Sequence, residues 1–215
     1  MSAPAVNQVR PIRAALDATG FARVTGVSRE TLDRLVAYVD LLTAWNQRIN
    51  LVGRNTIGDI WRRHILDCAQ LYKLLPRGTR VLVDLGSGAG LPGLILAGMG
   101  IDGVHLVESD QRKCAFLREA ARMMGVTVQI HAQRIEDVTG FAAGAVTARA
   151  LAPLDQLIDL SKNFSTPQTV FLFLKGESAE AELAAAPLAG SLKAELLPSR
   201  SDPAGRIVRI EATHG

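Results

Sequence analysis

The sequence has 215 residues, of which 48% are hydrophobic and 21% are charged, and its formal net charge is +3. This length and composition suit one globular α/β domain with at most a short appendage, and they exclude a disordered chain. The longest apolar run, residues 91–101, is too short to cross a bilayer. Two cysteines cannot form a disulfide framework or a four-ligand zinc site. Because residues 1–13 lack an apolar signal segment, we expect a cytoplasmic protein without a membrane partner.

Charge is unevenly distributed along the chain. Residues 1–80 contain twelve Lys and Arg against six Asp and Glu, a net charge of +6, whereas residues 81–215 carry a net charge of −3. A basic N-terminal third is typical of a surface that docks on a polyanion, but a solvated helix face has the same composition. Both interpretations stay open at the level of composition.

The N-terminal part of the chain shows two helical patterns. Residues 1–27 have no strong period. Ser28 then occupies an N-cap position, and apolar residues at three- and four-residue spacing predict a helix over residues 28–50. A second helical pattern covers residues 57–75 and ends at Pro76.

From residue 80 onward, strand patterns alternate with helical patterns. Strands are predicted over residues 81–85, 104–108, 127–131, 145–150, 170–175, 192–197 and 206–211, and helices over residues 91–99, 110–124, 154–163 and 177–186. This alternation predicts a mostly parallel sheet covered on both faces. The last two strands follow each other without a helix, which predicts a hairpin and an antiparallel strand at one edge. We therefore divide the chain into a helical extension, residues 1–79, and an α/β core, residues 80–215.

The strongest motif is the glycine-rich turn after the first strand, Asp84-Leu85-Gly86-Ser87-Gly88-Ala89-Gly90. Glycines at every second position permit a tight turn and let the backbone approach a ligand closely. The helix after the turn offers free backbone N–H groups at its start. Glu108 ends the next strand, where a carboxylate can accept hydrogen bonds from ribose hydroxyls. The turn and Glu108 together predict a ligand that contains adenosine.

Two cofactor classes compete for this site. Residues 88–93 match the G-x-G-x-x-G signature of dinucleotide-binding proteins. However, Gly88 lies three residues beyond Leu85, whereas the dinucleotide motif begins about where its strand ends. An acid at the strand end, Asp84, repels a pyrophosphate and suits a cationic ligand such as S-adenosylmethionine. We favour S-adenosylmethionine and keep an NAD-type oxidoreductase as the alternative.

Several further segments resemble the ribosomal RNA small-subunit methyltransferase G family, also called the glucose-inhibited division protein B family. The matching segments are Trp45-Asn46, Arg63-His64-Ile65-Leu66-Asp67, residues 84–93, Glu108-Ser109, Lys113-Cys114-Ala115-Phe116-Leu117, Arg134-Ile135-Glu136, Ala148-Arg149-Ala150 and Leu174-Lys175-Gly176. The glycine turn alone occurs in many methyltransferases. Its combination with residues 63–67 upstream and residues 148–150 downstream is far more specific.

The resemblance implies an α/β fold with a seven-stranded Rossmann-like S-adenosylmethionine-dependent methyltransferase sheet and an N-terminal helical extension. It also implies methyl transfer to N7 of a guanine in 16S ribosomal RNA, with S-adenosylhomocysteine as the product and the small ribosomal subunit as the partner. Since guanine N7 already carries a lone pair, alignment of the reactants suffices, and we expect neither a catalytic cysteine nor an acid–base pair.

Site residues follow from the resemblance by position. The expected cofactor-binding residues are Gly86 and Leu91 on the methionine side, Gly88 in the turn, Glu108 at the ribose, the backbone of Ile135 and Glu136 at the adenine, and Arg149. Arg149 is also expected to orient the incoming base, because arginine suits the O6 and N7 edge of guanine.

Four basic residues are predicted to contact the RNA, namely Arg62, Arg63, Arg134 and Lys175. Basic side chains next to an aromatic residue such as Trp61 can hold a phosphate and stack a base. We expect no metal site, because His64 and Asp67 share a helix face without a third ligand, and we expect a monomer. A non-catalytic RNA-binding factor in ribosome assembly is the second alternative.

Overall fold

A computed structural model describes residues 11–188 and 190–213 of the chain. The strands are β1 (Leu82–Leu85), β2 (Val104–Val107), β3 (Val128–His131), β4 (Ala145–Arg149), β5 (Val170–Lys175), β6 (Leu192–Pro198) and β7 (Arg206–Ala212). The helices are α1 (Ala18–Thr25), α2 (Arg29–Trp45), α3 (Asp67–Ala69), α4 (Gly93–Gly98), α5 (Gln111–Met124), α6 (Leu154–Ser161) and α7 (Ala179–Ala185). The tighter or wider helical turns are η2 (Arg54–Asp59), η3 (Trp61–Leu66), η4 (Gln70–Leu74), η5 (Ile135–Asp137) and η6 (Lys162–Phe164).

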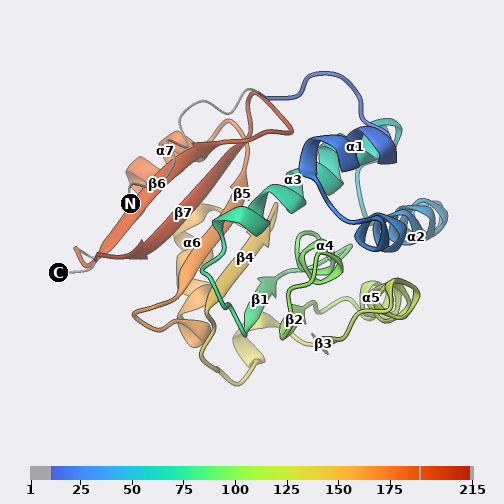
Figure 1. Cartoon of the computed structure of the whole chain (residues 1–215). Helices are drawn as coiled ribbons and strands as arrows, with labels where there is room; N and C mark the ends of the chain where they lie inside the picture. The colour runs from blue at the N-terminus through green and yellow to red at the C-terminus, as the bar shows by residue number, and fades with distance from the viewer. Residues whose placement is uncertain (1–10, 189, 214–215) are drawn as a thin grey trace.

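The strands form one seven-stranded sheet in the order β3-β2-β1-β4-β5-β7-β6 (Figure 1). Strands β1 to β5 pair in parallel, whereas β7 is antiparallel to both of its neighbours, β5 and β6. The predicted hairpin is confirmed, but its antiparallel strand lies one place in from the edge. Strand β7, which pairs with a strand on each side, carries three buried aliphatic residues, whereas the edge strand β6 carries only one.

The structure differs from the sequence prediction at both of the first two helices. Helix α1 was not predicted, because it is only eight residues long, and Phe21, its one buried residue, is accompanied only by the partly buried Ala18 and Val24. Helix α2 begins after Ser28 as predicted, but it ends at Trp45. Asn46 stops it: its buried Oδ1 accepts hydrogen bonds from the N–H groups of Leu51 and Val52, both at 2.9 Å.

Residues 54–74 form one run of helical turns with a changing pitch, where a single α-helix was predicted. The run passes from a 3-10 turn in η2 to a π-helix in η3, a short α turn in α3 and a second 3-10 turn in η4. A wide turn of this kind changes the direction in which successive side chains point, and it is frequent at functional sites. Here it directs Arg62, Arg63 and His64 to three different partners.

Helices cover both faces of the sheet and create two hydrophobic layers. The larger layer packs apolar side chains of β1, β2, β4 and β5 against α1 to α5, and the smaller one packs the opposite face against α6 and α7. The helical extension therefore shares one core with the sheet. The division between residues 79 and 80 stays a prediction, and its outer ends, residues 1–10 and 214–215, lie outside the described residues.

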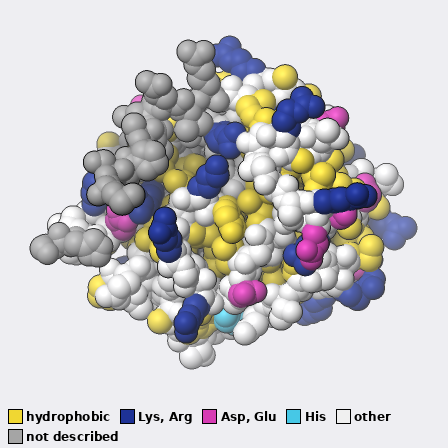
Figure 2. Space-filling model, in the orientation of Figure 1, with side chains coloured by type: hydrophobic (Ala, Val, Ile, Leu, Met, Phe, Trp, Pro, Cys, Tyr) yellow, Lys and Arg dark blue, Asp and Glu magenta, His cyan; other side chains and the backbone are white. Residues whose placement is uncertain are grey.

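Within residues 11–188 and 190–213, no helix is long and apolar enough to cross a membrane. Lys and Arg side chains are spread over the face shown in Figure 2, around an area of hydrophobic side chains.

Candidate functional site

The glycine turn follows β1, at the centre of the parallel part of the sheet. Gly86, Gly88 and Gly90 have φ angles of +60°, +55° and +79°, a region that favours glycine. A Cβ on Gly86 would lie 2.5 Å from Cδ1 of Leu151, so any larger residue at this position would force the Leu151 side chain to move. Tyr38 of α2 also holds the turn, since its buried hydroxyl donates a hydrogen bond to the carbonyl of Ala89 over 2.7 Å.

Asp84 holds the turn from inside the protein. Its carboxylate is fully buried and accepts hydrogen bonds from the hydroxyl of Thr147 at 2.9 Å and from the N–H of Gly93 at 3.2 Å. Burial raises the pKa of Asp84 to about 7, although the hydrogen bonds of Thr147 and Gly93 act in the opposite direction. The sequence suggested a carboxylate that faces a cationic ligand; in the structure, Asp84 faces the backbone of the turn and the start of α4.

Glu108 lies at the end of β2, next to the turn. Its Oε2 accepts a hydrogen bond from the N–H of Gly88 at 2.9 Å, and its Oε1 accepts one from the N–H of Asp110 at 2.8 Å. Each carboxylate oxygen has a second lone pair. The side chain is thus fixed in place and still able to accept hydrogen bonds from a ligand.

A cavity of about 390 Å³ opens beside Glu108 at the carboxyl ends of the parallel strands. This is the place where open α/β sheets bind ligands. It brings together five residues predicted from the sequence, namely Gly86, Glu108, Arg134, Ile135 and Glu136. Lining residues that the sequence analysis missed are Lys113, Gln133, Leu151 and Gln156. Each lies on a loop or helix next to a strand end, which is the signal that could have found them.

Three residues predicted to bind the cofactor lie outside this cavity lining, and one of them, Arg149, lines a second cavity instead, so that its cofactor role stays a prediction. Leu91 is buried in the larger hydrophobic layer. Gly88 contributes its N–H to Glu108. The roles of both at a cofactor stay predictions. The glycine cradle, the fixed carboxylate and the cavity size fit a nucleoside cofactor such as S-adenosylmethionine.

A second cavity, of about 450 Å³, lies at the ends of β4 and β5 and shares Ala150 with the first. It brings together three predicted residues, Arg63, Arg149 and Lys175. Ala150 has a φ angle of +50°, and it is the one residue other than glycine with a positive φ in the part of the chain that the structure describes. Strained backbone of this kind often occurs at functional sites.

The Arg149 guanidinium points from the end of β4 to the helical segment that begins at Trp61. Its Nη2 donates to Nδ1 of His64 at 2.7 Å and to the carbonyl of Arg63 at 3.2 Å. Its Nε lies 3.5 Å from Oδ2 of Asp67. A hydrogen bond of Nη1 to Cys68 Sγ, at 3.6 Å, completes the set. Arg149 therefore links the sheet to the helical extension.

His64 is neutral in this arrangement. Burial, followed by the charges of Arg149 and Arg63, lowers the pKa of His64 to about 3. Its Nε2 lies 2.7 Å from Oγ1 of Thr56, whose own hydroxyl donates to the carbonyl of Gly53. Nε2 therefore carries the proton, and Nδ1 accepts the hydrogen bond from Arg149.

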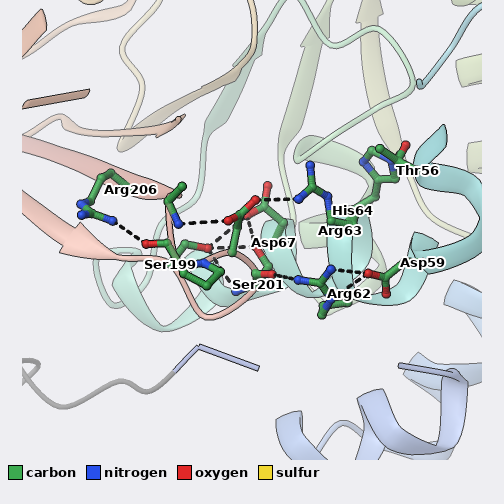
Figure 3. A network of polar contacts seen from close by, with 12 residues as sticks. Thr56, Asp59, Arg62, Arg63, His64, Asp67, Ser199, Ser201 and Arg206 are labelled. Atoms are coloured by element: carbon green, nitrogen blue, oxygen red, sulfur yellow. Dashed lines mark hydrogen bonds and ion pairs between the residues drawn. The ribbon is translucent and has the colours of Figure 1, made fainter. Parts of the chain in front are cut away.

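The same helical segment also holds the loop between β6 and β7 (Figure 3). Oδ1 of Asp67 accepts a hydrogen bond from the Ser201 hydroxyl at 2.5 Å. Arg62 donates to the carbonyl of Ser201 and pairs with Asp59, and Arg63 pairs with Asp202 over 2.6 Å. The side chain of Arg62 is 14% exposed and that of Arg63 41%. Arg63 is thus the more accessible of the two for RNA.

Lys175 is largely buried at the end of β5. Its Nζ pairs with Glu182 over 2.6 Å and donates to the carbonyl of Ala152 over 2.9 Å. Glu182 in turn accepts a hydrogen bond from the N–H of Leu154. These contacts fix the loop of residues 150–153 between the two cavities.

No group of three or more potential metal-ligating side chains occurs among residues 11–188 and 190–213. Cys68 contacts Arg149, but burial raises the pKa of its thiol to about 12, so the thiol stays protonated at neutral pH. A reactive thiolate at this position is therefore not supported.

Similarity to known proteins agrees with this site. Residues 31–197 match the family model described as rRNA small subunit methyltransferase G. The chain is 54% identical over 193 residues to the Ribosomal RNA small subunit methyltransferase G of Rhodospirillum centenum, covering 90% of this chain and 89% of that protein. It is 53% identical over 186 residues to the protein of the same name from Paramagnetospirillum magneticum, covering 86% of this chain and 91% of that protein.

Solved structures with low sequence identity share the fold. A ribosomal protein L11 methylase from Lactobacillus delbrueckii has a TM-score of 0.56 at 16% identity, covering 68% of this chain and 77% of its own. A variant of MtNAS in complex with S-adenosylmethionine has a TM-score of 0.55 at 16% identity, covering 93% of this chain and 85% of its own. The sequence matches, together with the glycine turn and its fixed carboxylate, establish that the chain belongs to the rRNA small subunit methyltransferase G family.

Proposed function

We propose that the chain transfers a methyl group from S-adenosylmethionine to N7 of one guanine in 16S ribosomal RNA. That it is an S-adenosylmethionine-dependent rRNA methyltransferase follows from its family and fold. The observation that supports the finer assignment is the pair of adjoining cavities. One cavity is lined by Glu108, whose carboxylate is placed to accept hydrogen bonds from a ribose, and the other is lined by Arg63 and Arg149.

Methyl transfer to guanine N7 requires few chemical groups from the protein. S-adenosylmethionine supplies an electrophilic methyl carbon, and its sulfur keeps the electron pair of the broken C–S bond. Guanine N7 forms the new bond with its in-plane lone pair and has no proton to lose, so the base becomes positively charged. The protein therefore needs to align the two reactants rather than to provide a general base. The protonated thiol of Cys68 and the neutral, fully hydrogen-bonded His64 agree with this requirement.

The residue roles follow the two cavities. On the cofactor side, Glu108 accepts hydrogen bonds from the ribose, the backbone of Ile135 and Glu136 borders the adenine, and Gly86 lines the methionine end. The roles of Gly88 and Leu91, which lie outside the cavity lining, rest on the resemblance to the family alone. On the acceptor side, Arg149 orients the base with the one N–H of Nη1 that its contacts to His64, Arg63, Asp67 and Cys68 leave free. Arg63 binds RNA with the exposed part of its guanidinium. Arg62 and Lys175 hold the walls of the same cavity and contribute positive charge, and Arg134 lies at the cofactor side.

The decisive experiment is transfer of labelled methyl groups to 30S particles and to deproteinised 16S RNA, followed by mapping of the modified base. We expect the label on N7 of a single guanine. Label on an exocyclic amine or on a ribosomal protein would contradict the assignment, although it would leave the fold unaffected. The comparison of the two substrates also shows whether the enzyme needs an assembled particle.

The alternatives make different predictions. Family membership argues against the NAD-type oxidoreductase. A non-catalytic assembly factor would bind RNA without turnover, and its binding would not respond to Gly86→Val. A monomer in the cytoplasm is the simplest state for this chain, and sedimentation of the purified protein tests the monomer.

A further inference from the structure

One wall of the second cavity is held in place by hydrogen bonds within the protein. Residues 62–70 hold the loop between β6 and β7 through a dense set of contacts (Figure 3). Gln70 donates to Ser199 Oγ at 3.0 Å and accepts from the N–H of Arg200 at 2.8 Å, and Asp67 accepts from Ser201. Ser199 and Ser201 are both buried. The loop is thus rigidly placed at the rim of the cavity.

One ion pair on this wall, Arg63 with Asp202, has hydrogen-bond donors and acceptors that remain available to a ligand in the cavity. Arg63 Nη1 donates to Asp202 Oδ2 over 2.6 Å, and Asp202 Oδ1 accepts from the N–H of Ala204 at 3.0 Å. The two side chains are 41% and 32% exposed. Apart from the bond to Asp202, no side-chain hydrogen bond of Arg63 to another described residue is present. The pair therefore offers free N–H donors beside free carboxylate lone pairs.

The other acidic groups at this cavity are less suited to the same task. Asp67 is engaged by Ser201, Gln70 and the ion pair with Arg149. Glu177 is exposed on the loop after β5, where no contact fixes its carboxylate among the described residues. Asp202 alone is both accessible and held in position from two sides.

We propose that this cavity holds the target base, and that Arg63 and Asp202 recognise the Watson–Crick edge of guanine. This inference rests on the proposed function. Guanine presents on that edge one acceptor, O6, followed by two donors, N1–H and the N2 amine. The Arg63 guanidinium matches O6, and the Asp202 carboxylate matches the two donors. Adenine presents an amine against Arg63 and the N1 lone pair against Asp202, so both contacts become unfavourable.

This orientation is compatible with attack from N7. N7 lies on the edge of the purine away from N1 and N2, so a base read by Asp202 turns its N7 away from the loop between β6 and β7. Ala150 lines both cavities and marks their junction. A purine bound in this way directs N7 toward that junction, where the methyl group must arrive.

The proposal is tested first by binding of nucleotides to the full chain saturated with S-adenosylhomocysteine. We would titrate the ¹⁵N-labelled protein with GMP, IMP and AMP and follow the amide resonances of Asp202, Ala204 and Gly205. Since IMP lacks the N2 amine, we expect the order GMP, IMP, AMP from tightest to weakest. GMP should bind about tenfold or more tighter than AMP, as is typical for a bidentate contact to one base. Equal affinities for GMP and AMP, shifts confined to other parts of the protein, or no shift with any nucleotide would each overturn the proposal.

Variants provide the second test. In Asp202→Asn, the amide keeps an acceptor for Ala204 but turns a donor toward guanine. We expect kcat/KM for RNA methylation to fall about tenfold or more and the preference for GMP over AMP to disappear, with unchanged affinity for S-adenosylhomocysteine. Asp159→Asn, at an exposed residue of α6 that pairs with Lys162, is the matched control and should leave all three quantities unchanged.

Failure of this inference is distinguishable from failure of the proposed function. If the unmodified chain methylates guanine N7 and Asp202→Asn behaves like Asp159→Asn, the assignment of the base reader is wrong. If the unmodified chain places no methyl group on guanine N7 of 16S RNA, the proposed function is wrong.

Discussion

The backbone N–H of Gly88 donates a hydrogen bond to Oε2 of Glu108 over 2.9 Å and so ties the glycine turn after β1 to the end of β2. The N–H of Asp110 holds the other carboxylate oxygen. A side chain fixed from two directions before the ligand binds loses little conformational entropy on binding. This arrangement supports our proposal that Glu108 binds the ribose.

We expect Glu108→Ala to raise the Kd for S-adenosylhomocysteine at least tenfold and to leave RNA affinity nearly unchanged. The basis is the loss of hydrogen bonds to a charged group, worth about 1.5–3 kcal/mol. Isothermal titration calorimetry with the cofactor product and a filter-binding assay with RNA separate the two effects. Glu195→Ala, at an exposed residue of β6, serves as the control. Equal losses of cofactor and RNA binding would contradict the division between the two cavities.

The buried carboxyl group of Asp84 predicts a specific pH dependence of stability. Its pKa is about 7 in the folded protein because burial disfavours the charged form, while the unfolded chain has the ordinary value near 4. Between these values the folded state binds more protons, so the free energy of unfolding falls as pH rises, by at most about 1.4 kcal/mol per pH unit. Above about pH 7 this contribution is constant.

Asp84→Asn removes this titration. We expect its free energy of unfolding, measured by urea denaturation and compared with that of the unmodified protein, to improve steadily from pH 4.5 to pH 7 and then to level off. The comparison cancels most other titrating groups. Asp159→Asn provides a control with an exposed carboxylate. A pH-independent difference for Asp84→Asn would show that the group is ionised throughout.

Removal of Arg149 should destabilise the protein as a whole. Its side chain and that of Asp67 are only 19% and 14% exposed, so Arg149→Met leaves the Asp67 carboxylate without its cation and the Nδ1 of His64 without its donor. We expect a loss of about 2–4 kcal/mol in the free energy of unfolding. Arg29→Met, which removes a fully exposed partner of Asp33, should change it by less than about 0.5 kcal/mol. If Arg149→Met has a similarly small effect, the network does not join the extension to the sheet in solution.

Gly86→Ala tests the close approach of Leu151 to the turn. The new Cβ would meet Leu151 at 2.5 Å on top of the unfavourable positive φ, whereas Gly26 has a similar φ with open space around it. We therefore expect Gly86→Ala to destabilise the protein by more than the roughly 1 kcal/mol expected for Gly26→Ala. The double variant Gly86→Ala with Leu151→Ala should recover part of the difference. Thermal unfolding of the unmodified protein, Gly86→Ala, Gly26→Ala, Leu151→Ala and the double variant measures these effects, and additive effects of Gly86→Ala and Leu151→Ala would exclude this contact as the cause.

The sequence by itself predicted the elements that local patterns control. The alternation of strand and helix patterns placed all seven strands within about two residues. The inner strands are largely buried and read as short apolar runs, whereas the edge strands β3 and β6 are mostly exposed or half-buried. Ser28 and Asp110 begin helices as their side chains favour. The glycine turn and Glu108 were both predicted, because a backbone with positive φ favours glycine and because Glu108 directly ends an apolar strand pattern.

Only the tertiary structure decided the remaining features, because they depend on contacts between distant residues. The π-helix at Trp61–Leu66 packs against α1, and β7 lies between β5 and β6 in the sheet, and no local period in the sequence reports either feature. Asp67, Arg149 and Ser201 are far apart in the sequence, but in the folded chain Asp67 contacts the other two, and all three line the second cavity. Residue types at a turn or strand are a local property, but the pairing of Arg63 with Asp202 exists only once the chain has folded.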